Sequence, residues 1–412
     1  MFPAARRRPA VMQRGVSQRR HRPDYVLLIL SAVLLVIGLV VIYSISPGLA
    51  VQRHVSENYY VVKQLVAIGL GCITFGIMAT VPYDIWRKLQ KPMIGAALLT
   101  TLIALAMPVS AEYPAHRWIR LGGLSFQSVE LIKFAVIFVF AAFLVERIKR
   151  GEVADKDKSL KPIGIAFAIM AFLIAGLQSD LGSTGVIIAM VGAMWFVAGL
   201  PAKYIALGVG GVMLVLLLAI STSGYRRDRV LTFMHPERDC AAAGYQACQA
   251  LIAVGSGGLF GKGIAHGAQA YGYVPEAAND SIFSILAEKF GFVGVTALLC
   301  IFWAFFTRLK NIIERAPDDF SRLVVTGILA WLSTQAIINI GAMIGLLPLK
   351  GITLPLISYG GTSIIFVTGA IGLVYNISRY TTYGVNEGTP VAPTRLPDQS
   401  NRRYSVVSSA RR

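Results

Sequence analysis

Residues 25–46 read YVLLILSAVLLVIGLVVIYSIS, an unbroken apolar stretch without a charged side chain. A membrane-spanning helix needs about 20 such residues, so this stretch alone can cross a bilayer. We identify ten apolar segments of this kind, at about 25–46, 60–81, 93–110, 128–146, 162–178, 181–200, 203–221, 281–307, 322–347 and 360–379. They are too long for the short alternating strands of a membrane β-barrel. The sequence therefore predicts an all-α, polytopic membrane protein with ten transmembrane helices.

The composition of the 412-residue chain excludes several other classes. Hydrophobic residues make up 55% of the chain and charged residues 15%, whereas about a quarter of a soluble domain is charged. A soluble enzyme, a disulfide scaffold and a disordered protein are therefore excluded. The net charge of +18 would also suit a nucleic-acid partner. Because the basic residues lie between the apolar segments and at the chain ends, we expect no nucleic acid.

The placement of the basic residues predicts the orientation of the chain in the membrane. With the N-terminus inside, 27 Lys and Arg residues fall on the inner side, and four fall in short outer loops: Arg53, Arg117, Arg120 and Lys350. An excess of this kind marks the cytoplasmic side of a membrane protein. Both termini are therefore predicted to be cytoplasmic, in the inner cell membrane, with the first span acting as a signal anchor.

The chain divides into three predicted regions. Residues 1–24 and 381–412 are rich in Arg, Pro, Ser and Gly and are predicted to be disordered cytoplasmic tails. The membrane domain covers residues 25–380 and includes a large outer loop, 222–280, between the seventh and eighth spans. Loops of this length are usually functional. Within it, Gln246–Ile264 is predicted to form a short helix at the membrane interface or re-entering its edge.

Ionisable residues gather at the outer ends of the predicted spans. Such residues are costly inside a membrane and are candidates for function. Glu130 and Lys133 stand three residues apart on one helix face, and Asp280 stands at the outer entry of the eighth span. The other charges on this side are Asp180, Arg226, Arg227, Arg229, Glu288, Lys289 and Lys350. Each could be a simple helix-end charge, but their shared side favours a polar cavity that opens outward.

Other motifs favour no further chemistry. The run GSGGLFGKG at 255–263 lacks the first Gly and the final Ser or Thr of a phosphate loop, and no strand precedes it. We therefore predict a flexible turn. No cluster of His, Cys and Asp has the spacing of a metal site. Cys240 and Cys248 share the outer loop, where a disulfide is permitted, and the sequence leaves their pairing open.

Several blocks of residues together resemble one known family. The stretch LPLKGITLPLISYGGTS at 347–363 is similar to a signature of the SEDS (shape, elongation, division and sporulation) family. Further blocks agree in the same order along the chain: 117–133, 178–182, 225–233, 246–263 and 275–283. The sequence KGITLP at 350–355 resembles the division member of the family more than the elongation member. Where this chain has Ser128, Ser179 and Asn279, the family usually has other residues.

The resemblance implies a peptidoglycan glycosyltransferase. Such an enzyme polymerises lipid II, a disaccharide-peptide on undecaprenyl pyrophosphate, at the outer face of the membrane. The family match makes Asp280 the essential acid, and the chemistry of the reaction makes it the candidate general base. The resemblance also implies a class B penicillin-binding protein as partner, among other division proteins.

The remaining charged residues receive expected roles around this reaction. Lys133 and Glu130 are expected to position Asp280, and Asp180 to order the same cavity. Lys350, Arg226 and Arg229 are expected to face the pyrophosphate, alone or with a divalent cation such as Mg²⁺ or Mn²⁺. Two alternatives remain open at this point: a lipid II flippase, and a scaffold without catalytic activity.

Overall fold

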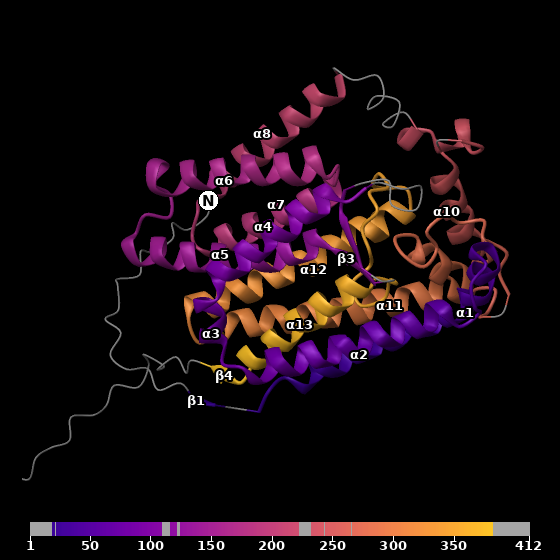
Figure 1. Cartoon of the computed structure of the whole chain (residues 1–412), viewed down its shortest axis with the longest axis horizontal. Helices are drawn as coiled ribbons and strands as arrows, with labels where there is room; N and C mark the ends of the chain where they lie inside the picture. The colour runs from indigo at the N-terminus through magenta and orange to yellow at the C-terminus, as the bar shows by residue number, and fades with distance from the viewer. Residues whose placement is uncertain are drawn as a thin grey trace, which may run out of the picture.

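The computed structural model describes residues 19–20, 22–108, 116–121, 124–221, 232–242, 244–264 and 266–381. Most of the predicted tails and the candidate residues Arg226, Arg227 and Arg229 lie outside these ranges. The described chain is mainly a bundle of long helices that run along one common direction (Figure 1).

A helix stands at each of the ten predicted apolar segments. These helices are α1 (Tyr25–Arg53), α2 (Tyr59–Thr80), α4 (Gln90–Ala106), α5 (Ser128–Arg150), α6 (Lys161–Ala171) with its π-helical ends η1 (Lys156–Leu160) and η2 (Phe172–Leu177), α7 (Leu181–Val197), α8 (Ala202–Ser221), α11 (Ile282–Glu314), α12 (Asp319–Met343) and α13 (Gly361–Ile377). Six of the described helices are long and apolar enough to cross a membrane, whereas α4, α7 and α13 are shorter apolar helices of 17 residues each. The helical membrane fold is therefore confirmed, and the number of crossings stays a prediction.

Small residues allow α2 and α13 to pack closely. A Cβ atom on Gly71 would lie 2.7 Å from Thr368 Oγ1, and one on Gly372 would lie 2.6 Å from the Phe75 carbonyl oxygen. Such residues at a helix interface let two backbones approach within a membrane domain. The two helices run in the same direction, because Tyr60 stacks edge-on against Tyr359 at one end and Asn376 donates to Met78 at the other.

The first and last described segments of the chain meet at one end of the bundle. The short strands β1 (Arg19–Arg20) and β4 (Tyr380–Thr381) pair antiparallel, and the Asp24 amide donates to Ser378 Oγ at 3.1 Å. Helix α10 (Tyr245–Ser256), in the segment that the sequence predicts to be an outer loop, lies at the opposite end of the bundle (Figure 1). This arrangement is the one that an even number of crossings would give.

Helix α11 is interrupted at Gly291, which has φ 63° and ψ −165°. The glycine-rich run after α10 lies along this break and supplies the missing partners. The Lys262 and Gly263 amides donate to the carbonyls of Glu288 and Lys289 at 2.9 and 3.0 Å, and the Phe292 amide donates to the Gly258 carbonyl. Non-helical backbone at membrane depth requires such protein partners. The run predicted to be a flexible turn therefore packs against α11 and supplies backbone hydrogen-bond partners at its break.

The structure also contains short strands that the sequence did not predict. Strands β2 (Trp118–Leu121) and β3 (Leu124–Gln127) pair antiparallel just before α5. The all-α prediction therefore misses a small hairpin, because strands of four residues give too little periodicity to detect. In the segment between α8 and α11, Cys240 and Cys248 form a disulfide. The short turns η3 (Pro236–Asp239) and η4 (Gln269–Tyr271) complete the described part of this loop.

Candidate active site

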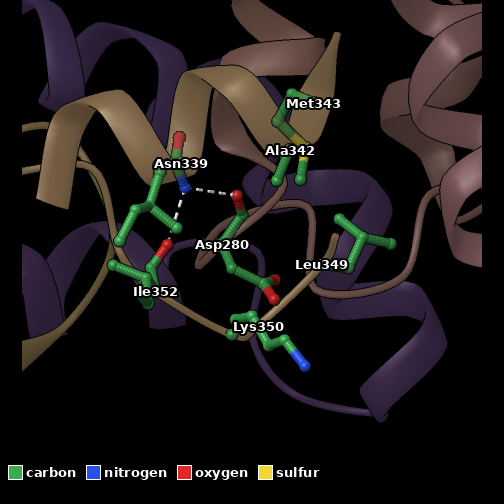
Figure 2. Close-up of a pocket in the computed structure, with 9 residues that line it drawn as sticks. Asp280, Asn339, Ala342, Met343, Leu349, Lys350 and Ile352 are labelled. Carbon is green, nitrogen blue, oxygen red and sulfur yellow. Dashed lines mark hydrogen bonds between the residues drawn. The ribbon is translucent and has the colours of Figure 1, made fainter. Parts of the chain in front are cut away.

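Asp280 lies in the turn that leads into α11 and lines a pocket together with residues from α12 and from the segment between α12 and α13. In Figure 2 its carboxylate points toward the side of the pocket where the Lys350 side chain lies. The residues that line the pocket are Asp280, Ile338, Asn339, Ala342, Met343, Leu349, Lys350, Gly351 and Ile352. Two of the predicted site residues, Asp280 and Lys350, are therefore brought together from segments 70 positions apart in the sequence.

A tight turn and a neighbouring loop fix the backbone around Asp280. Glu276 has φ 51°, and its carbonyl accepts from the amides of Asn279 and Ser281 at 2.9 and 3.2 Å. From the loop before α13, Ser358 Oγ donates to the Asn279 carbonyl at 2.6 Å, and the Tyr359 amide donates to the Ala278 carbonyl at 2.8 Å. The segment that carries Asp280 is thus bonded to the segment that resembles the family signature.

Burial controls the protonation of Asp280. The residue is 8% exposed, and its Oδ1 atom has no hydrogen-bond partner among the described residues. This burial, together with the nearby Glu276 carboxylate, raises the pKa of Asp280 to about 7. The Gln246 side chain and two backbone amides offset only part of the rise. A pKa near neutrality is suited to a general base, because the group can both accept and release a proton at physiological pH.

Glu130 and Lys133 form a buried ion pair on α5, as their spacing predicts. Lys133 Nζ donates to Glu130 Oε1 at 2.7 Å, and both side chains are less than 5% exposed. The same ammonium donates to Gln335 Oε1 on α12 at 3.3 Å and lies 4.9 Å from the centre of the Trp331 ring. Gln335 Nε2 donates in turn to the Thr353 carbonyl at 3.1 Å. The pair is therefore linked, through Gln335, to the loop that carries Lys350.

Asp180 is the N-cap residue of α7. Its carboxylate accepts from the Ser183 amide at 3.0 Å and from Ser183 Oγ at 2.9 Å, at the N-terminus of α7. Arg117 Nη1 lies 3.8 Å from Asp180 Oδ2, and a Cβ on Gly182 would lie 3.1 Å from the Lys350 carbonyl oxygen. This segment thus packs against the backbone of Lys350.

The sequence prediction missed two buried amide side chains on α12. Asn339 Nδ2 donates to the Asp280 carbonyl at 2.6 Å and to the Ile352 carbonyl at 2.7 Å. Gln335 stands one turn earlier, where it donates to the Thr353 carbonyl and accepts from Lys133 Nζ. A signal was present, because two amides four residues apart inside an apolar span lie on one helix face. Neither side chain is ionisable, so both stand outside the predicted set of charged site residues.

The described residues do not form a metal site made of protein ligands alone. No group of three or more His, Cys, Asp and Glu side chains converges within the part of the chain that the structure describes. Hard divalent cations such as Mg²⁺ take six oxygen ligands and commonly bind through one or two carboxylates and substrate phosphates. The residues present therefore fit a cation only if the substrate supplies most of its ligands.

Comparison with known proteins shows the family. A family model described as "Cell cycle protein" (FtsW, RodA and SpoVE) matches residues 25–383. A probable peptidoglycan glycosyltransferase FtsW of Saccharophagus degradans is 36% identical over 382 residues, which cover 91% of this chain and 97% of that protein. The stage V sporulation protein E of Bacillus subtilis is 35% identical over 371 residues, or 89% of this chain and all of that protein.

Solved structures share the same fold. One is a chain from a study of how a peptidoglycan synthase complex coordinates polymerization and crosslinking, with a TM-score of 0.73 and 28% identity over 87% of this chain and 98% of that chain. Another is the rod shape determining protein RodA of Thermus thermophilus, with a TM-score of 0.61 and 27% identity over 87% of this chain and 97% of that chain. The fold, the pocket and these relatives define the class, a glycosyltransferase built from membrane helices. The chain belongs to the FtsW/RodA/SpoVE family of cell cycle proteins, the SEDS family that its motifs resemble.

Proposed function

We propose that this protein polymerises lipid II into glycan strands at the outer face of the cytoplasmic membrane during cell division. The observation that carries the proposal is the Asp280 carboxylate, buried in a pocket beside Lys350 at the end of the bundle opposite the paired chain ends. The family membership and the relatives named as peptidoglycan glycosyltransferases FtsW support the substrate class and the division role.

Asp280 acts as the general base in this proposal. The carboxylate takes the proton from the acceptor sugar hydroxyl while the oxygen of that hydroxyl forms a bond to the anomeric carbon of the donor. The bond from that carbon to the pyrophosphate oxygen breaks, and the lipid pyrophosphate leaves as an anion. Because pyrophosphate leaves without taking up a proton, the reaction needs no second carboxylic acid, which a glycoside hydrolase would require.

Cationic groups stabilise the negative charge that gathers on the leaving pyrophosphate. Lys350 lines the same pocket as Asp280, which supports this role for it. Arg226 and Arg229 are proposed for the same role from the sequence. A divalent cation would supply further positive charge at the leaving pyrophosphate, whose oxygens would provide most of its ligands.

Replacing Lys350 with Ala should lower the rate of lipid II polymerisation by about 10- to 100-fold, the equivalent of one charge-assisted hydrogen bond. The expected reason is weaker stabilisation of the pyrophosphate by the pocket. Initial rates on labelled lipid II measure the effect. Lys149→Ala at the exposed end of α5 removes the same charge away from the pocket and is the control. Equal rates for wild type and Lys350→Ala would show that Lys350 does not contribute to the reaction.

The rate of polymerisation should rise with pH and level off above about pH 7. A general base works in its deprotonated form, and burial raises the pKa of Asp280 to about 7. Below that pH the rate should fall about tenfold per unit, as the carboxylate takes up a proton. Initial rates between pH 5.5 and 8.5 at saturating lipid II measure the profile. A flat profile across this range would rule out Asp280 as the rate-controlling base.

The outward orientation of the site is part of the proposal. The positive-inside distribution of Lys and Arg supports it, as does the Cys240–Cys248 disulfide in the outer loop, because disulfides persist in oxidising compartments. A class B penicillin-binding protein is the proposed partner that crosslinks the product, among other division proteins. The similarity to a chain of a peptidoglycan synthase complex supports such a partner.

Two other functions make different predictions. A flippase would carry its binding charges near the bilayer midplane, open to both sides, whereas the Asp280 pocket lies at one end of the bundle. A scaffold would need no buried carboxylate in a pocket. Purified protein with its partner transpeptidase, given labelled lipid II in vesicles, separates the three. Glycan chains support the polymerase, and lipid II that crosses the vesicle membrane without forming polymer supports the flippase. The absence of both polymer and crossing supports the scaffold.

A further inference from the structure

A single amide side chain joins the two segments that form the Asp280 pocket. Asn339, on α12, donates one hydrogen of its amide group to the Asp280 carbonyl at 2.6 Å and the other to the Ile352 carbonyl at 2.7 Å. Figure 2 shows both bonds leaving the same nitrogen atom. Asp280 and Ile352 belong to different loops, and Ile352 is two residues from Lys350. The amide therefore fixes the distance between the candidate base and the loop that carries the candidate cation.

The chemistry of this position favours a specific role over simple packing. Asn339 is 2% exposed, and its Oδ1 atom has no hydrogen-bond partner in the described part of the chain. Burying a polar group costs free energy unless its bonds are made, and an apolar residue of the same size avoids that cost. The two donors are the part of this side chain that is used. Both of them go to the backbone of the pocket.

Neighbouring contacts extend this bridge to the buried ion pair. Gln335 stands one turn before Asn339 on the same face of α12. It donates to Thr353 and accepts from Lys133 Nζ at 3.3 Å. A continuous set of hydrogen bonds thus runs from Glu130 and Lys133 through the 352–353 backbone to the carbonyl of Asp280. Lys133 reaches Asp280 through this set, which gives a physical path for the positioning role that the sequence predicted.

We infer that Asn339 is a positioning residue that holds the Asp280 carboxylate at a fixed place in the pocket through its two bonds to the Asp280 and Ile352 carbonyls. The inference rests on the proposed function, in which Asp280 is the base. A misplacement of about 1 Å in a reacting group can cost about 100-fold in rate. Loss of the bridge should therefore lower the turnover of bound substrate and leave substrate binding nearly unchanged.

The chain contains a matched control for this inference. Asn376, on α13, is also 2% exposed and also donates two bonds to backbone carbonyls, those of Met78 and Val81. These bonds join α13 to the C-terminal end of α2, at the end of the bundle where β1 and β4 pair. Asn339→Ala and Asn376→Ala therefore remove the same chemistry from equally buried positions. Only the first lies at the pocket.

The test compares the two variants in detergent, with the partner transpeptidase and labelled lipid II. Both should lower the unfolding temperature by a similar amount. Asn339→Ala should lower kcat at least tenfold with KM changed less than about twofold, while Asn376→Ala should leave both within about twofold. Equal changes in kcat for the two variants, or an unchanged kcat in Asn339→Ala, would overturn the inference.

Two further measurements keep the test decisive. If Asn339→Ala does not fold, Ser358→Ala removes a different hydrogen bond to the same segment, the donation to the Asn279 carbonyl, and should also lower kcat without raising KM. Unchanged kcat in that variant would count against the inference. Amide hydrogen exchange of residues 276–281 should rise in Asn339→Ala and stay as in wild type in Asn376→Ala. This exchange is measured independently of activity. A wild type that makes no glycan would contradict the proposed function, while the exchange result would still decide whether Asn339 holds residues 276–281 in place.

Discussion

Replacing Lys133 with Met should lower the free energy of unfolding by about 3–5 kcal/mol, the usual cost of removing one partner of a buried ion pair. Lys133 Nζ is 2.7 Å from Glu130 Oε1, and both side chains are buried. Without the ammonium, the buried Glu130 carboxylate has lost its charged partner, which is costly in free energy. Denaturant or thermal unfolding of the purified protein measures the loss.

Two variants serve as controls for this prediction. Glu146 and Arg150 form a pair on the same helix, but they are 54% and 58% exposed. Arg150→Met should therefore change stability by less than about 1 kcal/mol. The double variant Glu130→Gln with Lys133→Met should recover most of the stability, because no unpaired charge remains. If the exposed and buried pairs cost the same, the ion pair does not contribute as the structure indicates.

Replacing Asp280 with Asn should lower the rate of polymerisation by about 100- to 10,000-fold, the usual contribution of a general base. Asn has nearly the same size and shape, so the pocket keeps its geometry, but the amide cannot accept the proton from the acceptor hydroxyl. Gel analysis of labelled lipid II measures the product. Glu276→Gln, which neutralises the exposed carboxylate near Asp280, is the control and should keep most of the activity.

The same substitution, Asp280→Asn, should stabilise the folded protein at pH 8. Burial raises the pKa of Asp280 to about 7 from an ordinary value of 3.8, so the folded state favours the protonated acid. In the wild type, the raised pKa of Asp280 stabilises the folded state while the carboxyl group is protonated. This contribution is complete below about pH 3.8 and is lost as the pH rises through about 7. The amide of the variant remains neutral at every pH, so the gain should reach about 4 kcal/mol above pH 7 and shrink as the pH falls toward 3.8. Equal unfolding temperatures for the two proteins at pH 8 would show that Asp280 is not buried in this way.

A variant that is more stable and less active is typical of an active site, where a group needed for chemistry is held in an unfavourable environment. The two outcomes together are more informative than either alone. A loss of activity with a loss of stability would describe a structural residue. A loss of activity with a gain in stability describes a buried base.

The sequence predicted the helical segments well because hydrophobic length is a direct physical requirement of a bilayer. Helix α7 begins at the first residue of the predicted apolar segment 181–200, and the contact between Glu130 and Lys133 follows from their three-residue spacing. The meeting of Asp280 with Lys350 came from the shared side of their spans and from the family resemblance. The first two of these features can be detected within one helix or at one helix end, whereas the third also needs the side of each span and the family motifs.

The features that escaped prediction depend on contacts between distant segments. The break at Gly291 is stabilised by a backbone 30 residues earlier in the chain, around Gly261, and nothing in the α11 sequence alone requires it. The role of Asn339 depends on which carbonyls lie opposite α12 in the folded bundle. The roles of Arg226 and Arg229 stay sequence predictions, because both lie outside the described residues.

The most direct test of the central claim is the polymerisation of labelled lipid II by wild type and Asp280→Asn, each purified with its partner transpeptidase and each shown to be folded by thermal unfolding at the same pH. The account predicts glycan chains from the wild type and none above background from the variant, although the variant is at least as stable. Equal polymerisation by the two proteins would contradict the account, because it would remove the buried carboxylate from the reaction.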